Sequence, residues 1–455
     1  MTNIIKLNSN ITLECTVEEI LIQCIKDNTF DNPIYRNNEL NHRSNWTIES
    51  KIKTYRYEGK SLVLPRGYMR NLLNIFHEQN ITPQIIDERV SQPCSFPRSL
   101  KGITLRPYQE RAVEAAMKFD QGTIVSPTGS GKSLLALEIV RRRQQKTLIL
   151  VHRKELAEQW AKVIKERMDF LVAGMIGNGS WEIGDITVAM IQTLSSKQEK
   201  TKEMADTFGL IIADECQHLP SNTFFNVMDL LNAKYRYGLS ATVRRADGLE
   251  EMIYRCVGEA ISTISRDEVE SLGSTVPTVV KALETGFSPA VNSWHDYLEE
   301  ISVNTERNLL ITDLAASQTS PVLILCDRIA HTENLSEMLS RNNLKHVLAH
   351  GQIQDRDEIM EKIKKAQITI ATASLIGEGI DIDSWSILIM ASPISSEIKL
   401  LQCIGRIVRP KDGKEVAVVF DLKDNCGFSG ASFKKRFEIY KKHKIWVEFS
   451  NKKVA

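Results

Sequence analysis

The chain has 455 residues, of which 42% are hydrophobic and 25% charged, and its net charge is +1. This length corresponds to roughly three domains of an ordinary globular protein. A net charge so close to zero excludes a globally basic nucleic-acid-binding protein, so any basic surface must be local.

Cysteine usage and the N-terminus indicate the compartment. The 8 cysteines stand singly, which argues against a zinc knuckle or a disulfide framework and favours free thiols in a reducing compartment. The N-terminal "MTNIIKLNSNITLEC" has no charged head followed by an apolar core, and no apolar run approaches the ~18 residues of a membrane span. We therefore expect a cytoplasmic protein that does not contact membranes.

Residues 1–100 are expected to form a small accessory domain, which ends at the turn-rich "SQPCSFPRS". Residues 36–70 carry eight Lys or Arg against three acids, a local charge of +5. The interleaved aromatic residues are Trp46, Tyr55, Tyr57 and Tyr68. This stretch fits a nucleic-acid surface that combines phosphate contact with stacking, and equally a domain whose aromatics form the core. The alternating "KIKTYRYEGKSLVL" predicts a hairpin.

Two larger units of similar pattern follow. Over residues 101–258, short runs such as "TLILVH", "ITVAMI" and "LIIAD" alternate with helical patterns, which predicts a parallel sheet covered on both faces. The alternation restarts at "VLILCD" and continues over residues 321–455, whereas residues 259–320 are mixed and are expected to be a linker with a small insertion. The predicted fold class is α/β, with two tandem parallel-sheet domains and an extra N-terminal domain.

The first unit contains the glycine-rich loop "SPTGSGKS", residues 126–133, between an expected strand and an expected helix. Gly129 and Gly131 would let backbone N–H groups approach phosphates, Lys132 would reach the β- and γ-phosphates, and the Ser133 hydroxyl would hold Mg²⁺. The alternative is a chance Gly/Ser turn, because Ser126 replaces the usual first glycine. The loop residues expected to bind the nucleotide are Thr128, Gly129, Ser130, Gly131, Lys132 and Ser133.

A pair of acids follows another apolar run, in "FGLIIADECQH". Asp214 is expected at the carboxyl edge of the sheet, where it would hold Mg²⁺ through water, and Glu215 would orient and deprotonate the attacking water. The alternative is a pair of solvated loop acids. Gln217 and His218 either couple this site to its neighbours or cap a helix.

Several segments in order resemble the motifs of superfamily 2 helicases. They are "LRPYQ", "SPTGSGKS", "LVHRKELAEQW", "VAMIQTL", "DECQH", "GLSAT", "ATASLIGEGIDI" and "QCIGRIVR". The resemblance covers residues 105–422 and implies that both units are RecA-like. Within the superfamily, "LRPYQERAVEAAM" and "YRYGLSATVRRADG" look closest to the XPB and phage UvsW type. Where the XPB type has an Arg-Glu-Asp triplet, this chain has Arg245, Ala246 and Asp247.

The resemblance implies roles for further residues. Gln109 would read adenine, and Arg106 would stack on the base or brace the loop. Ser240 and Thr242 would couple hydrolysis to domain movement. Residues expected to act on the nucleotide from the second unit are Gly379, Asp381, Gln402, Arg406 and Arg409, the last three on one helix face and the two arginines as arginine fingers. Backbone contacts to the nucleic-acid strand are expected from Arg153, Thr193 and Thr372, each of which could instead be a structural hydrogen-bonder.

These likenesses imply a monomeric DNA helicase or translocase that uses ATP and Mg²⁺, prefers branched DNA such as forks and four-way junctions, and moves 3′ to 5′ as the family usually does. Its phage-type likeness suggests a viral origin. An RNA helicase with the same core, or an ATP-gated DNA clamp or annealing factor that does not unwind, remains open.

The C-terminal "FKKRFEIYKKHKIW" places Phe433, Phe437 and Tyr440 at helical spacing, which favours packing against the second unit. The basic residues of this segment either track a DNA backbone or form a solvated face. They are Lys434, Lys435, Arg436, Lys441, Lys442 and Lys444.

Overall fold

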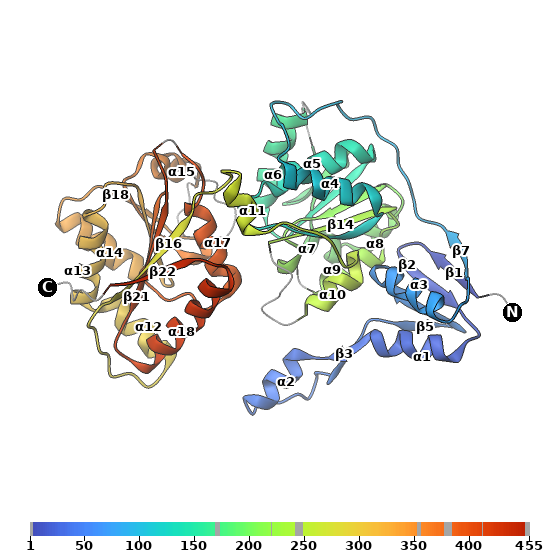
Figure 1. Ribbon diagram of the computed structural model, residues 1–455, viewed down its shortest axis with the longest axis horizontal. Helices are drawn as coiled ribbons and strands as arrows, with labels where there is room; N and C mark the ends of the chain where they lie inside the picture. The colour runs from blue at the N-terminus through green and yellow to red at the C-terminus, as the bar shows by residue number, and fades with distance from the viewer. Residues whose placement is uncertain are drawn as a thin grey trace. The chain divides into compact units, whose positions relative to one another are not determined.

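The structure is a computed structural model that describes residues 3–168, 173–219, 221–241, 249–352, 356–376, 385–411 and 413–450 (Figure 1). The chain forms two compact units, Met1–Pro127 with Gly131–Ser265, and Arg266–Ala455 with Thr128–Ser130. Thr242, Gly379, Asp381 and the triplet at residues 245–247, which were singled out from the sequence, lie outside the described residues.

The N-terminal domain of the first unit is a sheet with strand order β5-β6-β2-β1-β7. Its elements are β1 (Ile4–Leu7), β2 (Asn10–Glu14), α1 (Glu18–Asp27), β5 (Arg56–Glu58), β6 (Ser61–Pro65), α3 (Met69–Glu78) and β7 (Gln84–Asp87). The predicted hairpin is confirmed, because β5 and β6 pair antiparallel. Between α1 and β5, β3 (Thr29–Asp31) and β4 (Lys51–Lys53) pair as a two-stranded arm that carries α2 (Pro33–Leu40) beyond it in Figure 1.

The basic and aromatic residues of this domain divide between surface and interior. Tyr68 is fully buried and Tyr55 packs against the domain core, whereas Tyr57 and Trp46 are exposed, Trp46 to 94%. Arg66, counted with the basic surface, is also buried. Its guanidinium donates to Gln121 Oε1 at 2.8 Å and to the carbonyl oxygens of Ala233 and Lys234, so it joins the N-terminal domain to the parallel sheet of the same unit.

Among the described residues, the larger sheet of the first unit has the order β11-β10-β12-β9-β13-β14-β8-β15. Its strands are β8 (Gln121–Val125), β9 (Thr147–Val151), β10 (Gly174–Gly177), β11 (Ser180–Trp181), β12 (Ile186–Met190), β13 (Leu210–Ala213), β14 (Tyr235–Ser240) and β15 (Ala260–Thr263). All neighbours pair parallel except β10 with β11. The helices are α4 (Pro107–Lys118), α5 (Lys132–Arg143), α6 (Lys154–Met168), α7 (Ile191–Ser196), α8 (Gln198–Glu203), α9 (Ser221–Asp229) and α10 (Glu250–Val257).

The second unit contains a parallel sheet with the order β18-β19-β17-β20-β21-β16-β22 over its described residues. Its strands are β16 (Thr278–Glu284), β17 (Val322–Cys326), β18 (His346–Ala349), β19 (Ile368–Thr372), β20 (Ile387–Met390), β21 (Ala417–Lys423) and β22 (Trp446–Ser450). The helices are α11 (Arg266–Ser271), α12 (Trp294–Val303), α13 (Thr305–Ala316), α14 (Ile329–Arg341), α15 (Arg356–Lys365), α16 (Ala373–Ile376), α17 (Glu397–Ile407) and α18 (Gly427–Lys442).

Both faces of this second sheet are covered, as the continuous apolar runs predict. Leu323 and Leu325 of β17 join one hydrophobic cluster with α17, while Val322 and Ile324 join another with α13 and α14. The two RecA-like parallel-sheet domains expected from the sequence are therefore present. The segment 259–320 contributes β15 to the first sheet, and β16, α12 and α13 to the second unit.

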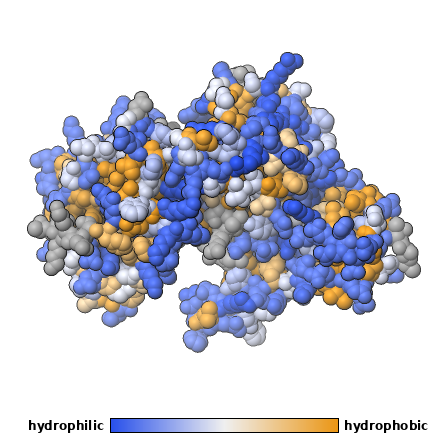
Figure 2. All heavy atoms as spheres, in the orientation of Figure 1, coloured by the Kyte–Doolittle hydropathy of each residue, from blue (hydrophilic) through white to orange (hydrophobic). Residues whose placement is uncertain are grey.

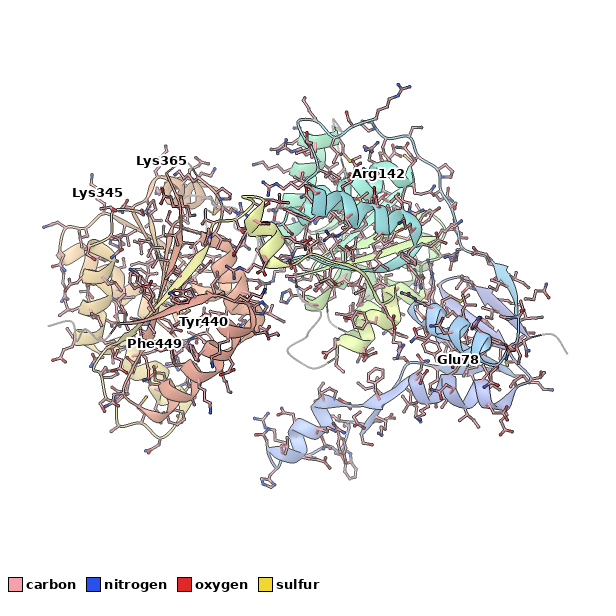
Figure 3. The ribbon with its side chains drawn as sticks, in the orientation of Figure 1. Glu78, Arg142, Lys345, Lys365, Tyr440 and Phe449 are labelled. Atoms are coloured by element: carbon pink, nitrogen blue, oxygen red, sulfur yellow. The ribbon has the colours of Figure 1, made fainter. Side chains whose placement is uncertain are left out.

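The C-terminal aromatic stripe packs inward, which confirms that part of the prediction. Tyr440 is fully buried, and Phe433 contacts Phe449 edge-on with ring centroids 6.2 Å apart (Tyr440 and Phe449 are labelled in Figure 3). Arg436 is also buried and forms a two-pronged ion pair with Asp421, at 2.7 and 2.8 Å. The suggestion that Arg436 tracks a DNA backbone is therefore wrong, because a helical residue on the apolar face points into the core.

On the face drawn in Figure 2, hydrophilic side chains cover most of the described surface and hydrophobic ones form separate patches. Among the described helices, none combines the length and apolar character that a bilayer crossing requires. None of the eight cysteines, all of which lie in the described part of the chain, forms a disulfide.

Candidate active site

The candidate site lies along one edge of the large sheet of the first unit. Strands β12, β9, β13, β14 and β8 are neighbours in that order and all run parallel, so their carboxyl ends share this edge. The glycine-rich loop follows β8, Ser240 ends β14, and Asp214 follows β13. Arg153 follows β9, and Thr193 lies in α7 directly after β12. The residues predicted to bind the nucleotide thus occupy one half of the edge. The residues predicted to contact the nucleic-acid backbone occupy the other half.

The loop has the backbone that its glycines predict. Gly129 and Gly131 have φ of 86° and 80°, a region that residues with a Cβ rarely adopt, and Gly131 is the N-cap of α5. A Cβ at Gly131 would stand 2.5 Å from Gln109 Nε2, so the buried amide of Gln109 lies directly against the loop. The Gln109 carbonyl accepts from the backbone N–H of Arg106, the N-cap of α4, at 2.9 Å. This bond fixes the amide group on the loop side.

Ion pairs connect α4, which carries Gln109, to α5, which begins at Lys132. Arg142, labelled in Figure 3, lies near the end of α5 and contacts Glu110 of α4 at 2.6 Å and Glu138 of α5 at 2.7 Å. Glu110 directly follows Gln109. The pairing therefore ties the start of α4, which holds the candidate base reader, to the helix that begins at Lys132.

Lys132, Asp214 and Glu215 meet at this edge. Lys132 Nζ is 2.7 Å from Glu215 Oε1, and both side chains are less than one-fifth exposed. Glu215 has a φ of 45°, which is unusual for a residue with a Cβ and concentrates at functional sites. Asp214 is buried, and its Oδ1 accepts from the Glu215 N–H at 2.9 Å. The loop lysine and the two acids after the apolar run are thus parts of one site.

The electrostatics of these groups suit a divalent cation. Burial raises the pKa of Glu215, but the adjacent Lys132 ammonium outweighs it and lowers that pKa to about 2. Burial and the neighbouring Glu215 charge raise the pKa of Asp214 to about 6. Two carboxylates with one ammonium leave a net negative charge at this edge, and Ser133 directly follows Lys132 at the start of α5. Carboxylate and hydroxyl oxygens are ligands that Mg²⁺ accepts, so these residues fit the ion that the sequence implies.

Gln217 connects the acids to the end of β14. Its amide N–H donates to Glu215 Oε2, and its carbonyl accepts from the Ser240 hydroxyl at 2.6 Å. This chain of hydrogen bonds runs from the candidate water-orienting acid to the serine expected to couple hydrolysis to movement. Of the two sequence interpretations of Gln217, the structure supports coupling.

Two residues in this area were missed by the sequence interpretation. The indole N–H of Trp160, on α6, donates to Asp214 Oδ2 at 2.8 Å, and Trp160 is only 2% exposed. The His152 ring lies 5.5 Å from the His218 ring, centroid to centroid, and burial lowers the pKa of His152 to about 4. Both residues stand in "LVHRKELAEQW", but helical spacing shows only that Trp160 faces inward and not which atom its N–H meets.

The predicted strand contacts of the first unit lie close together. Arg153 is exposed, at the start of α6, and Thr193 is half-buried on α7. The Gln192 side chain donates to the His152 carbonyl at 3.0 Å and so links the two segments. The edge therefore presents an arginine and a threonine from adjacent strand ends, as a surface that binds phosphates would require.

The predicted residues of the second unit fall on two elements. Gln402 is buried and Arg406 half-buried on α17, and Thr372 is buried at the end of β19. Arg409 lies beyond α17, whose last residue is Ile407, so the expectation of three residues on one helix face is wrong for Arg409. Pro410 explains the difference, because a residue that precedes proline disfavours the helical conformation. Burial lowers the pKa of the Arg409 guanidinium.

Comparison with known proteins identifies both units. Residues 102–245 match the family described as Type III restriction enzyme, res subunit, and residues 305–411 match the Helicase conserved C-terminal domain. The DNA 3'-5' translocase XPB2 of Sulfurisphaera tokodaii is 28% identical over 406 residues, which cover 79% of this chain and 90% of that protein. The Probable helicase D10 of Escherichia phage T5 is 28% identical over 421 residues, which cover 85% and 89%.

A solved structure supports the fold alone. It is S. cerevisiae Dbp5 bound to RNA and ADP BeF3, with a TM-score of 0.58 and 18% identity over 77% of this chain and 90% of that one. The fold, the phosphate-type loop and the paired acids define an ATP-dependent helicase. The chain belongs to the superfamily 2 helicases, and its relatives there include the XPB type.

Proposed function

We propose that the protein is an ATP- and Mg²⁺-dependent 3′ to 5′ DNA translocase or helicase that remodels branched DNA during recombination, repair or replication, and that it acts as a cytoplasmic monomer. The observation that carries the proposal is the arrangement of one sheet edge. Lys132, Asp214 and Glu215 meet there, and Arg153 and Thr193 follow the adjacent strands β9 and β12. A relative named as a DNA 3'-5' translocase supports the choice of DNA and of polarity.

In this proposal the residues act in sequence. Lys132 leaves Glu215 and binds the β- and γ-phosphates of the incoming nucleotide, while the Gln109 amide beside the loop contacts adenine. Glu215, freed from its ammonium partner, then accepts a proton from the attacking water. Mg²⁺, when bound through Ser133 and Asp214, supplies positive charge at the phosphates. Arg406 and Arg409 would act as arginine fingers from the second unit, a role worth ~10³-fold or more in rate.

Phosphate contacts by Arg153, Thr193 and Thr372 would follow the strand backbone without reading sequence. The exposed Trp46 and Tyr57 of the N-terminal domain are available for stacking on bases that are unpaired at a fork or unstacked at the centre of a junction, positions that linear duplex lacks. The preference for branches rests on these aromatics and on the phage-type likeness of the motifs.

The test is ATP hydrolysis by the purified protein with no nucleic acid, single-stranded DNA, linear duplex DNA, a four-way junction or duplex RNA. Strongest stimulation by the junction, followed by branch migration of a labelled junction, is the expected result. Strongest stimulation by RNA would refute the DNA assignment. Junction-stimulated hydrolysis without strand displacement would instead identify an ATP-gated clamp.

A further inference from the structure

We infer that Trp160 is a positioning residue that holds the proposed Mg²⁺ carboxylate, Asp214, in one orientation through its indole N–H. The inference rests on the ATPase part of the proposed function and not on the nucleic-acid substrate. The contact joins the middle of α6 to the residue that follows β13, and its donor and acceptor are both buried.

The hydrogen bonds of Asp214 show why one donor matters. Its Oδ2 accepts from Trp160 Nε1 at 2.8 Å, and its Oδ1 accepts from the Glu215 N–H at 2.9 Å. The Asp214 N–H donates to the Leu150 carbonyl of the neighbouring strand β9 at 3.0 Å. The backbone is thus anchored by the sheet, and the rotation of the carboxylate is fixed by one N–H at each oxygen. Without the indole, the Oδ2 end would lose its restraint.

Packing alone does not account for this contact. Trp160 belongs to the buried face of α6 with Ala157, Ile164 and Met168, so its ring would be buried in any case. A buried indole N–H must nevertheless find an acceptor, and the one it meets is the carboxylate proposed to hold Mg²⁺. Removing a group that orients a metal-binding side chain in this way typically lowers metal affinity about 10- to 100-fold.

Trp160→Phe separates the two roles, because phenylalanine keeps an aromatic ring in the core but has no N–H. Trp385 provides a matched control. It is fully buried in the second unit, and its indole N–H also donates to one side-chain oxygen, Thr369 Oγ1, at 3.2 Å. Trp385→Phe therefore removes a hydrogen bond of the same kind from the sheet of the second unit, whereas Asp214 follows a strand of the first-unit sheet.

The experiment measures binding of ADP to the full chain by calorimetry, in EDTA and across a Mg²⁺ titration, without nucleic acid. We expect Trp160→Phe to bind ADP like wild type in EDTA and to need about tenfold more Mg²⁺ for half-maximal enhancement of ADP affinity. Trp385→Phe should follow wild type in both conditions. A wild-type Mg²⁺ dependence in Trp160→Phe would overturn the inference, as would an equal loss of ADP affinity with and without Mg²⁺.

A second measurement serves if Trp160→Phe does not fold. In wild-type protein with ¹⁵N-labelled indoles, adding Mg²⁺ to the ADP-bound state should shift one of the signals from the 6 tryptophans. No shift in any signal would overturn the inference. Neither measurement needs turnover or DNA, so a protein that binds Mg²⁺ and ADP as expected but does not act on DNA would contradict the proposed function and leave this inference intact.

Discussion

Replacing Glu215 with glutamine should tighten nucleotide binding while it stops hydrolysis. In the structure Lys132 Nζ lies 2.7 Å from Glu215 Oε1, and the same ammonium must contact the phosphates when ATP binds. Wild-type binding therefore includes the loss of an ion pair. Glu215→Gln removes the charge that holds Lys132 and keeps the size of the side chain, so this loss no longer opposes binding.

The structure sets the scale of the effect. Lys132 is the main cause that lowers the pKa of Glu215 from 4.5 to about 2, and a difference of this size corresponds to roughly 3 kcal/mol of preference for the anion. Burial, the largest single cause, raises that pKa, so the interactions that favour the anion exceed this net preference, and Gln217 contributes part of them. A tenfold gain in affinity corresponds to about 1.4 kcal/mol, less than half of the net value. We expect ATP to bind about tenfold more tightly. The turnover rate should fall by ~10²–10⁴-fold, since the base is lost.

The assay is titration with a fluorescent ATP analogue, together with single-turnover hydrolysis. Glu158→Gln is the matched control, because it breaks the Lys154–Glu158 pair, whose side chains are 52% and 62% exposed. Exposed pairs contribute ~0–1 kcal/mol, so its affinity and rate should stay close to wild type. If Glu215→Gln loses hydrolysis but binds ATP no more tightly than wild type, the Lys132–Glu215 ion pair does not oppose ATP binding.

Three further outcomes follow from other residues. Arg66→Lys should destabilise the first unit by about 2–4 kcal/mol in urea unfolding, because buried carbonyls lose their donors. An unchanged urea midpoint would show that the hydrogen bonds of Arg66 do not stabilise this unit. Arg409→Ala should keep ATP binding and lose turnover by ~10³-fold in steady-state hydrolysis; unchanged turnover would remove its role. Burial, with Arg307 nearby, lowers the pKa of His331 to about 3, and its Nε2 lies 2.9 Å from Asn308 Oδ1. Below pH ~6.5 the unfolded chain binds a proton that the folded chain does not, so stability should fall by about 1.4 kcal/mol per pH unit toward pH 3. His331→Gln should flatten that slope in unfolding measured from pH 7 to 5, and an unaltered slope would show that His331 is not its source.

Features that depend on residues close together in the chain were predicted well from the sequence. Alternating apolar runs and helices gave both parallel sheets, and the positions of Lys132, Asp214 and Glu215 follow from where a strand ends and a helix begins. The end of α17 is an exception, because Arg409 was wrongly predicted on the helix although Pro410 directly after it disfavours the helical conformation there. Local pattern therefore carried most of the fold and the nucleotide half of the site.

Contacts between distant residues were not predictable in this way. Counting charges placed Arg66 and Arg436 on basic surfaces, yet both are buried, Arg66 against carbonyls near residue 233 and Arg436 against Asp421. A charge count gives the sign of a segment but not the direction of each side chain. Trp160 and Asp214 are 54 residues apart, and only the folded sheet brings the indole to the carboxylate.

The position of Trp160 bears on how the two halves of the sheet edge communicate. Arg153 directly precedes α6, and Trp160 lies seven residues later, or about two helical turns. With the strand contact proposed for Arg153, a phosphate that pulls on the start of α6 would also displace the indole that holds Asp214. The same end of α6 is tied to α7 through the bond from Gln192 to the His152 carbonyl. In the DNA motor proposed above, binding of a DNA strand would thus change the orientation of the Asp214 carboxylate through α6. Stimulation of ATP hydrolysis by DNA should accordingly be weaker in Trp160→Phe than in Trp385→Phe at saturating Mg²⁺, and equal stimulation in the two variants would rule out this route.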